Sequence, residues 1–250
     1  NQLEHALKEN PKNPMAWNSL GSAKKSKNLF NEAEESFKKA LNLEPKYLNA
    51  LNSYGVLLSE ELEYKNSIKQ FEKALDISST DLEVFENYID ALSGDEQTEK
   101  ALKLINENLG KFSYPTSLKL LMANILARIG NLEESIDILM KLIDQEPTYF
   151  KAYESFSTIY KFKKSDKIIT KMKEAFNTED LNATDTIRLG FSLGKAFHDI
   201  KEYDQAFYAY TRANKSRRQE LFYDSNNFNK IITEIKTTIN KKWINTKKVF

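Results

Sequence analysis

Two pairs of adjacent carboxylates, Glu60–Glu61 and Glu133–Glu134, have side chains of a type that could support general acid–base catalysis. That chemistry needs two carboxyls that face each other across a substrate. Adjacent residues of a helix point in different directions, so neither pair resembles such a dyad. The chain has two histidines, too few for a histidine-based zinc site, and no cysteine for a thiolate site or a nucleophile.

No other motif adds catalytic chemistry. The sequence contains no glycine-rich phosphate loop, no Ser/His/Asp arrangement of recognisable spacing and no H-E-x-x-H segment. We expect His198 to be a partly solvated structural residue and His5 to be exposed. The sequence therefore predicts a segment that is not an enzyme and holds no cofactor and no metal.

The composition indicates a helix-rich chain. Of its 250 residues, 40% are hydrophobic and 29% charged, and there are only 7 glycines and 5 prolines. An all-β fold needs turn residues about every ten positions. No apolar run approaches the roughly 18 residues that span a bilayer, and no signal peptide opens the chain. These features predict a cytoplasmic protein with no membrane partner.

The sequence repeats every 34 residues, and the elements of this repeat must position any binding residue. Gly21 and Phe37 recur as Gly55 and Phe71, and later copies reach to about residue 218. The residues that mark the copies are Trp17, Leu20, Gly21, Ala33, Phe37, Ala40 and Pro45; Leu51, Tyr54, Gly55, Leu58, Ser67, Phe71 and Ala74; Phe85, Tyr88, Leu92, Ala101 and Ile105; Met122, Ala123, Leu126, Ser135, Leu139, Leu142 and Pro147; Tyr153, Phe156, Tyr160, Ile168, Met172 and Ala175; and Leu193, Gly194, Phe197, Ala206, Tyr210 and Ala213.

This pattern resembles that of the tetratricopeptide repeat (TPR) family, W-x2-L-G-x2-Y…A-x3-F…P. The resemblance implies an all-α, right-handed α-α superhelix (a TPR solenoid) of helical hairpins with a C-terminal capping helix. Small residues such as Gly21 would let the two helices of a hairpin approach closely, and Phe37 would fill the gap towards the next repeat. The predicted segments are 1–13, the second helix of a truncated repeat; an array over 14–218 with repeats 14–47, 48–81, 82–115, 116–149, 150–183 and 184–218; and 219–250, a capping helix and basic tail leading towards a missing domain.

The two ends complete the array. Pro11 precedes Pro45 by one period, which marks the truncated repeat, and Leu3 and Leu7 would lie on its open face, where a homodimer could form. Ser225 is typical of an N-cap for a helix from Asn226 to about Asn240, which would cover the last repeat.

The first helices of a TPR array line a groove, and its exposed positions can be deduced from the repeat. Chaperone-binding TPR domains hold a C-terminal carboxylate there with Lys, Asn and Arg. The third repeat instead presents Glu83, Glu86 and Asp90, which would repel a carboxylate. We therefore exclude that class of partner.

A series of asparagines predicts peptide binding in this groove, because an amide both donates and accepts hydrogen bonds and can hold an extended backbone. The superhelical part of O-linked N-acetylglucosamine transferase is similar in using an asparagine ladder, although here the asparagines do not share one position of the repeat. Ordinary solvated polar positions are the alternative interpretation. The candidate groove residues are Asn18, Asn49, Asn52, Asn87, Asn124, Ser22, Glu83 and Asp90.

The segment Leu193–Lys215 resembles the "LGKA…D…YD-AF-…Y…AN…R" segment of bacterial proteins in which TPR repeats precede a sulfotransferase domain. The resemblance implies a substrate- or partner-binding region of a larger protein whose donor-binding loop would lie beyond Phe250. No site residue is carried over.

Three functions remain open. The first is a binding module that presents a protein or peptide to an attached sulfotransferase domain, and the second is a free-standing adaptor or assembly scaffold. The third is a helical array that binds nucleic acid, since residues 201–250 hold 11 basic and 5 acidic groups in a chain of net charge +1. The lysines of that tail lack interleaved aromatic residues, so the nucleic-acid function ranks last.

Overall fold

The computed structural model describes residues 2–113, 115–178, 181–220, 232–233 and 235–236. These residues form thirteen α-helices and one short 3-10 helix, with no strand among them. The predicted all-α class is therefore confirmed. The chain divides into two compact units, residues 1–160 and 161–250, and each is described by itself.

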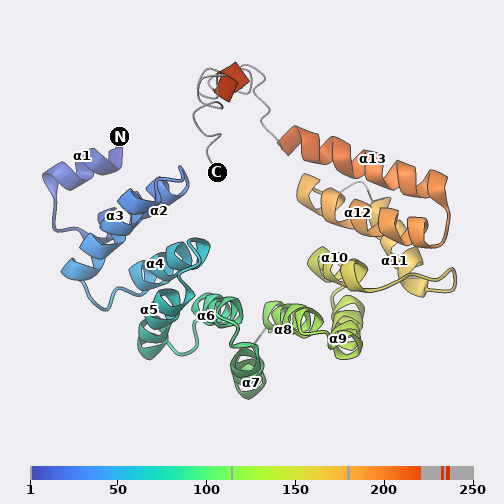
Figure 1. The fold of residues 1–250 in the computed structure, drawn as a ribbon, viewed down its shortest axis with the longest axis horizontal. Coiled ribbons are helices and arrows are strands. Elements are labelled where there is room, and N and C mark those ends of the chain that lie inside the picture. The colour runs from blue at the N-terminus through green and yellow to red at the C-terminus, as the bar shows by residue number, and fades with distance from the viewer. Residues whose placement is uncertain (1, 114, 179–180, 221–231, 234, 237–250) are drawn as a thin grey trace, which may run out of the picture. The chain divides into compact units, whose positions relative to one another are not determined.

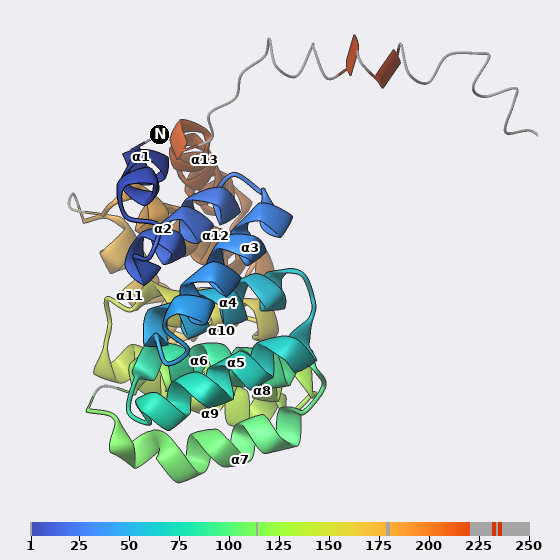
Figure 2. The same ribbon diagram turned by 90° about the vertical axis from the view of Figure 1, so that its left-hand side faces the viewer.

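The first unit is a row of antiparallel helix pairs that follows one short helix (Figures 1 and 2). In Figure 1, α4, α6 and α8 lie on the inner side of this unit and α5, α7 and α9 on its outer side. Its elements are α1 (Gln2–Glu9), α2 (Pro14–Lys25), α3 (Phe30–Leu43), α4 (Leu48–Glu60), α5 (Tyr64–Ile77), α6 (Leu82–Gly94), α7 (Thr98–Asn108), η1 (Leu109–Lys111), α8 (Thr116–Arg128), α9 (Leu132–Gln145) and α10 (Phe150–Ile159).

The turn inside each helix pair has the same geometry. Asn28, Leu62, Glu96 and Gly130 lie 34 residues apart and all have positive φ, between 59° and 87°. In each turn, the N–H of the residue after the left-handed one donates a hydrogen bond to the carbonyl five residues before it. An example is Leu29 N to Lys24 O at 3.0 Å. These are Schellman caps, which favour glycine at the left-handed residue. Sequence reasoning missed this feature, because only one of the four residues is glycine.

Glycine and an aromatic ring pack against each other within a helix pair. A Cβ on Gly55 would lie 2.6 Å from Phe71 Cε1, and one on Gly21 would lie 2.6 Å from Phe37 Cε1. Both rings are completely buried. The glycine therefore makes room for the ring of its own repeat, whereas the sequence had suggested that Phe37 fills the gap towards the next repeat. Phe37 also reaches that repeat, since its ring centroid lies 6.4 Å from that of Tyr54.

The N-terminal helix corrects one expectation. Leu7 is only 7% exposed and packs with Ala16, Leu20 and the partly buried Leu3 and Trp17. Leu7 is therefore engaged within the chain and not available on an open face, whereas Leu3 stays partly exposed, and the homodimer stays a prediction.

The second unit contains α11 (Lys167–Phe176), α12 (Ala183–Asp199) and α13 (Tyr203–Glu220). α12 packs against both α11 and α13. A Cβ on Gly194 would lie 2.5 Å from Tyr210 Cε1, which repeats the glycine–aromatic contact of the first unit.

An acidic side chain fastens the start of the second unit. Asp199 accepts hydrogen bonds from the Phe162 backbone N–H at 3.0 Å and from Lys195 Nζ at 2.6 Å. Desolvation raises the pKa of the Asp199 carboxyl, but these two hydrogen bonds, together with the positive charge of Lys195, outweigh it, and the pKa lies below its usual value.

The domain boundaries of the sequence stay predictions. The predicted fifth repeat, 150–183, is divided between the units, since α10 belongs to the first and α11 to the second. The predicted capping helix from residue 226 to about 240 lies outside the described residues, apart from 232–233 and 235–236. No helix in the described part of the chain has the length and apolar character to cross a membrane.

Candidate functional site

The structure brings half of the predicted groove residues into one hollow of the first unit. This hollow has a volume of about 320 Å³ and lies where α2, α4 and the start of α6 meet. Its walls are predominantly polar. They are formed by Asn18, Leu48, Asn49, Asn52, Ser53, Asp81, Glu83 and Val84. Of the predicted residues, Asn18, Asn49, Asn52 and Glu83 line the hollow, and Asn87, Asn124, Ser22 and Asp90 do not.

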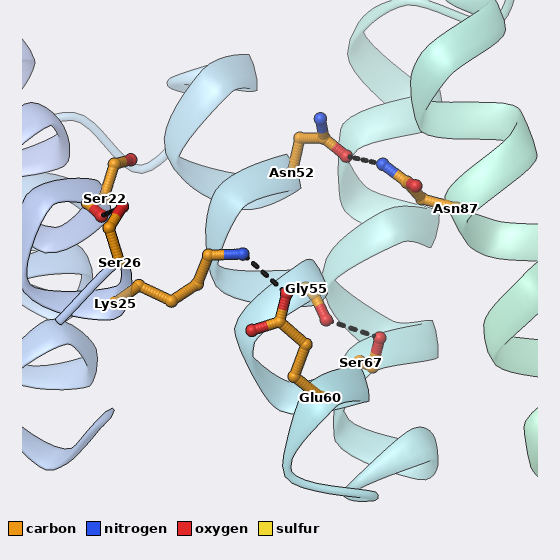
Figure 3. A network of polar contacts seen from close by, with 8 residues as sticks. All are labelled: Ser22, Lys25, Ser26, Asn52, Gly55, Glu60, Ser67 and Asn87. Carbon is orange, nitrogen blue, oxygen red and sulfur yellow. Dashed lines mark hydrogen bonds and ion pairs between the residues drawn. The ribbon is translucent and has the colours of Figure 1, made fainter. Parts of the chain in front are cut away.

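Asn52 joins α4 to one turn of α6. Its Nδ2 donates to Glu83 Oε1 at 2.9 Å, and its Oδ1 accepts from Asn87 Nδ2 at 2.9 Å. Figure 3 shows the amides of Asn52 and Asn87 pointing toward each other. Because an ionised carboxylate can only accept, the nitrogen of Asn52 must face Glu83, and the nitrogen of Asn87 must then face the oxygen of Asn52. The orientation of both amides therefore follows from the charge of Glu83.

Asp81 forms part of the wall of the hollow. It is the N-cap of α6, where its Oδ1 accepts from the Val84 N–H at 3.0 Å. Capping satisfies one of the free N–H groups at the helix start, and the helix dipole favours negative charge there. Sequence reasoning placed Ser53 among the exposed groove positions of the second repeat but did not include Asp81. An aspartate directly before a repeat's first helix is a recognisable cap, so Asp81 could have been found.

Asn18 contributes a hydrogen-bond acceptor that has no donor. Its Oδ1 is inaccessible to solvent and has no hydrogen-bond partner among the described residues. A buried acceptor without a donor costs about 1–3 kcal/mol. Asn18 lines the hollow and carries a buried, unsatisfied oxygen.

The acidic character continues along the inner side of α6. Ser117 of α8 donates a hydrogen bond to Glu86. Desolvation, assisted by the charge of Glu86, raises the pKa of the Asp90 carboxyl, although Arg128 opposes this rise. Asp90 is surface-exposed as a residue, but neighbouring helices displace enough water from its carboxyl for desolvation to dominate.

The lysines of α2 are engaged elsewhere. Lys25 Nζ lies 2.7 Å from Glu60 Oε1, at the far end of α4, and Lys24 Nζ lies 3.3 Å from Glu32. Figure 3 shows that the Lys25–Glu60 pair is separate from the Asn52–Asn87 pair. Within the described ranges, no lysine or arginine nitrogen comes within 4.0 Å of Asp81 or Glu83.

The groups that could have suggested catalysis have other partners. Glu60 forms the ion pair with Lys25, and exposed His5 lies 3.6 Å from Glu9. His198 is exposed, and its ring meets the edge of Tyr203 with centroids 5.6 Å apart. Across the part of the chain that the structure describes, no group of three or more histidine, aspartate or glutamate residues could hold a metal ion.

A family model matches most of the first unit. Residues 12–169 match the model of the tetratricopeptide repeat protein 21 ARM repeat. No protein with a curated description matches the chain.

Solved structures share the fold at low sequence identity. YrrB, described as a TPR protein with an unusual peptide-binding site, is 20% identical, with 84% of this chain and 97% of that chain covered and a TM-score of 0.52. A TPR protein from Parabacteroides merdae is 17% identical over 92% of this chain and 88% of that chain, with a TM-score of 0.58. Pseudomonas aeruginosa pilF is 18% identical over 88% of this chain and 97% of that chain, with a TM-score of 0.56. These likenesses confirm the predicted class of fold, an all-α TPR solenoid.

Proposed function

Because the chain belongs to the tetratricopeptide repeat protein 21 ARM repeat family, we propose that it is a protein-interaction module that holds an extended segment of a partner protein. The segment lies along the inner side of the first unit, over α2, α4 and α6. The peptide-binding site for which YrrB is described supports a peptide as the class of ligand. The repeats supply binding surface, and the fold is typically non-catalytic.

The observation that carries this proposal is the arrangement of Asn52 and Asn87. Each amide uses one of its two N–H groups within the chain, at 2.9 Å in both cases. Each therefore retains one N–H, and the oxygen of Asn87 accepts no hydrogen bond from the described residues. An amide with a free N–H and a free oxygen matches the C=O and N–H of a peptide bond. Asn87 can thus bind a backbone whatever the side chains of the peptide are.

The charge around these amides selects which part of a partner can lie there. Glu83, Glu86 and Asp90 all belong to α6 and face this region, so a C-terminal carboxylate would meet like charges. An internal stretch of polypeptide has no such charge. The module is therefore suited to internal segments of a partner.

A display experiment tests the function. A pool of random peptides of about twelve residues with amidated ends is selected on the full chain, and the dissociation constants of the selected peptides are measured. The Asn87→Ala variant should bind them about tenfold more weakly, because two hydrogen bonds of about 0.5–1.5 kcal/mol each are lost. The matched control is Asn42→Ala, since Asn42 is exposed on the outer helix α3. If both variants bind like the original chain, this inner side is not the binding site.

We also propose that the module is part of a longer protein with a sulfotransferase domain. The resemblance of Leu193–Lys215 supports this, although the contacts of Gly194 with Tyr210 and of Lys195 with Asp199 explain several of the resembling residues by packing alone. The encoded sequence beyond Phe250 decides the matter: a downstream loop for a 5′-phosphosulfate donor would support the proposal, and its absence would refute it. A free-standing scaffold is then the alternative.

A further inference from the structure

We propose that the hollow between α2, α4 and α6 is a pocket for a positively charged side chain, lysine or arginine, of the bound segment. The inference rests on the proposed peptide-binding function and adds a sequence preference to it. The asparagines would hold the backbone of the segment, and the hollow would select one of its side chains.

Two carboxylates at the hollow each keep one oxygen available. Asp81 uses Oδ1 to cap α6, and Glu83 uses Oε1 to accept from Asn52. The second oxygen of each accepts no hydrogen bond from any described residue, and no described lysine or arginine lies within 4.0 Å. The pocket thus has two units of negative charge without a cation of its own.

The unpartnered oxygen of Asn18 is an independent indication of a missing donor. This Oδ1 is buried and has no partner in the described part of the chain, and Asn18 lines the same hollow as the two carboxylates. The terminal torsion of an asparagine side chain is broad, so a rotation of the amide would turn this oxygen into the hollow when a donor binds there. A lysine ammonium carries three N–H groups and a guanidinium five. An ammonium thus has enough donors for one oxygen each of Asn18, Asp81 and Glu83.

The hollow suits the charged end of such a side chain. Its walls are predominantly polar, and Leu48 and Val84 contribute only a small apolar part of them. Long basic side chains keep their charged end in polar surroundings. A volume of about 320 Å³ leaves room for the charged end together with water.

The amide chain holds one carboxylate in place for this purpose. Asn52 and Asn87 favour one orientation of Glu83 before any ligand arrives, since the three side chains are joined by hydrogen bonds of 2.9 Å each. A pre-positioned group loses less freedom when it binds. Asp81 is fixed in the same way by its cap on α6.

The test uses small compounds that represent single residues. Uniformly ¹⁵N-labelled full chain is titrated with N-acetyl-lysinamide, N-acetyl-argininamide, N-acetyl-norleucinamide and N-acetyl-glutaminamide, and the side-chain amide signals of Asn18, Asn49 and Asn52 are followed. The two basic compounds should shift these signals in the millimolar range. Norleucinamide has the stem of lysine without the charge, and glutaminamide has hydrogen bonds without the charge, so neither should produce the shifts. Raising the salt concentration from about 0.02 M to about 0.5 M should weaken the basic compounds.

One variant isolates the charge. Glu83→Gln keeps an acceptor for Asn52 and removes the negative charge, so the affinity for N-acetyl-lysinamide should fall about fivefold, as for a partly exposed ion pair. The control Glu99→Gln removes a charge from exposed Glu99 on the outer helix α7 and should leave the affinity unchanged. Any of three results would overturn the pocket. These are shifts with N-acetyl-norleucinamide equal to those with the basic compounds, no shifts with either basic compound, or an equal loss of affinity in both variants.

The peptide pool separates this inference from the function on which it rests. Selected peptides that lose affinity in Asn87→Ala and are enriched in lysine or arginine support both. Peptides that lose affinity in Asn87→Ala without such enrichment overturn the pocket and leave the binding function standing. Peptides that bind equally well to Asn87→Ala overturn the function, whatever the small compounds do.

Discussion

Replacement of Gly55 by alanine tests the packing on which the repeat depends. The new Cβ would lie 2.6, 2.8 and 2.9 Å from three carbons of the Phe71 ring. Carbon atoms pack favourably at about 3.5–4.0 Å, so the ring would have to move by about 1 Å. Phe71 has no exposed surface and belongs to the main core cluster of the first unit, so it has no space to move into.

The expected effect follows from two opposing contributions. Overpacking a filled core costs about 1–3 kcal/mol. Replacing glycine by alanine inside a helix returns about 0.5–1 kcal/mol. Gly55→Ala should therefore lower the free energy of unfolding by about 1–2 kcal/mol. If the core had space beside Gly55, the same change would stabilise the chain, so the sign of the effect alone is informative.

The assay is urea unfolding monitored by far-ultraviolet circular dichroism. The slope of the unfolding free energy against urea concentration is compared between variants to detect a change in cooperativity. Gly110→Ala is the matched control, because a Cβ there meets no atom within 4 Å. In the Gly55→Ala background, Phe71→Leu should cost at least about 1 kcal/mol less than in the original chain, since the smaller side chain accommodates the methyl group. A stabilised Gly55→Ala variant, or additive effects in the double variant, would refute this account of the packing.

Three further changes have predictable results. Leu62 is 71% exposed at φ 63°, and Leu62→Gly should stabilise the chain by about 0.5–1 kcal/mol in urea unfolding. Leu62→Ala keeps the β-carbon that disfavours the left-handed conformation and should not give this gain. Burial, and then the hydrogen bond donated to Glu72, raises the pKa of Tyr88 to about 12. The stability that comes from the protonated phenol is therefore complete below the unfolded pKa of about 10 and is lost as the pH rises towards 12, a loss that Tyr88→Phe should abolish in alkaline unfolding curves. The lowered pKa of Asp199 gives the opposite dependence, with stability present above about pH 3.9 and lost as the pH falls through the folded value. Asp199→Asn should remove this acid dependence and cost about 1–3 kcal/mol near neutral pH, as measured by thermal unfolding across a pH series.

The positions that bury side chains were predictable from the sequence. Gly21 with Phe37 and Gly55 with Phe71 recur at one spacing, and a buried helix pair requires small and large residues at fixed positions. The turns were not predictable in the same way. Leu62 adopts a left-handed conformation because the packing of α4 against α5 imposes it, so residue type gives no signal there.

For the candidate site, the sequence could indicate which residues take part but not how they contact one another. Asn18 and Asn52 share a position of the repeat, which indicated one face, but Asn87 lies one residue out of that register. Only the three-dimensional structure shows that Asn52 reaches both Glu83 and Asn87 from the neighbouring helix. The hollow also depends on Asp81. Its position in the sequence indicates a helix cap, which uses one carboxylate oxygen and gives no sign that the second oxygen stays available.

The link made by Asn52 has a mechanical consequence for the first unit. On this inner side, α4 and α6 are joined by two neutral or singly charged hydrogen bonds among partly exposed side chains, whereas their buried surfaces are joined by apolar packing. Water can exchange with the former at little cost and with the latter only at great cost. The seam between these two repeats can therefore widen at its inner edge while its core stays closed, which lets a guest adjust the curvature of the unit there.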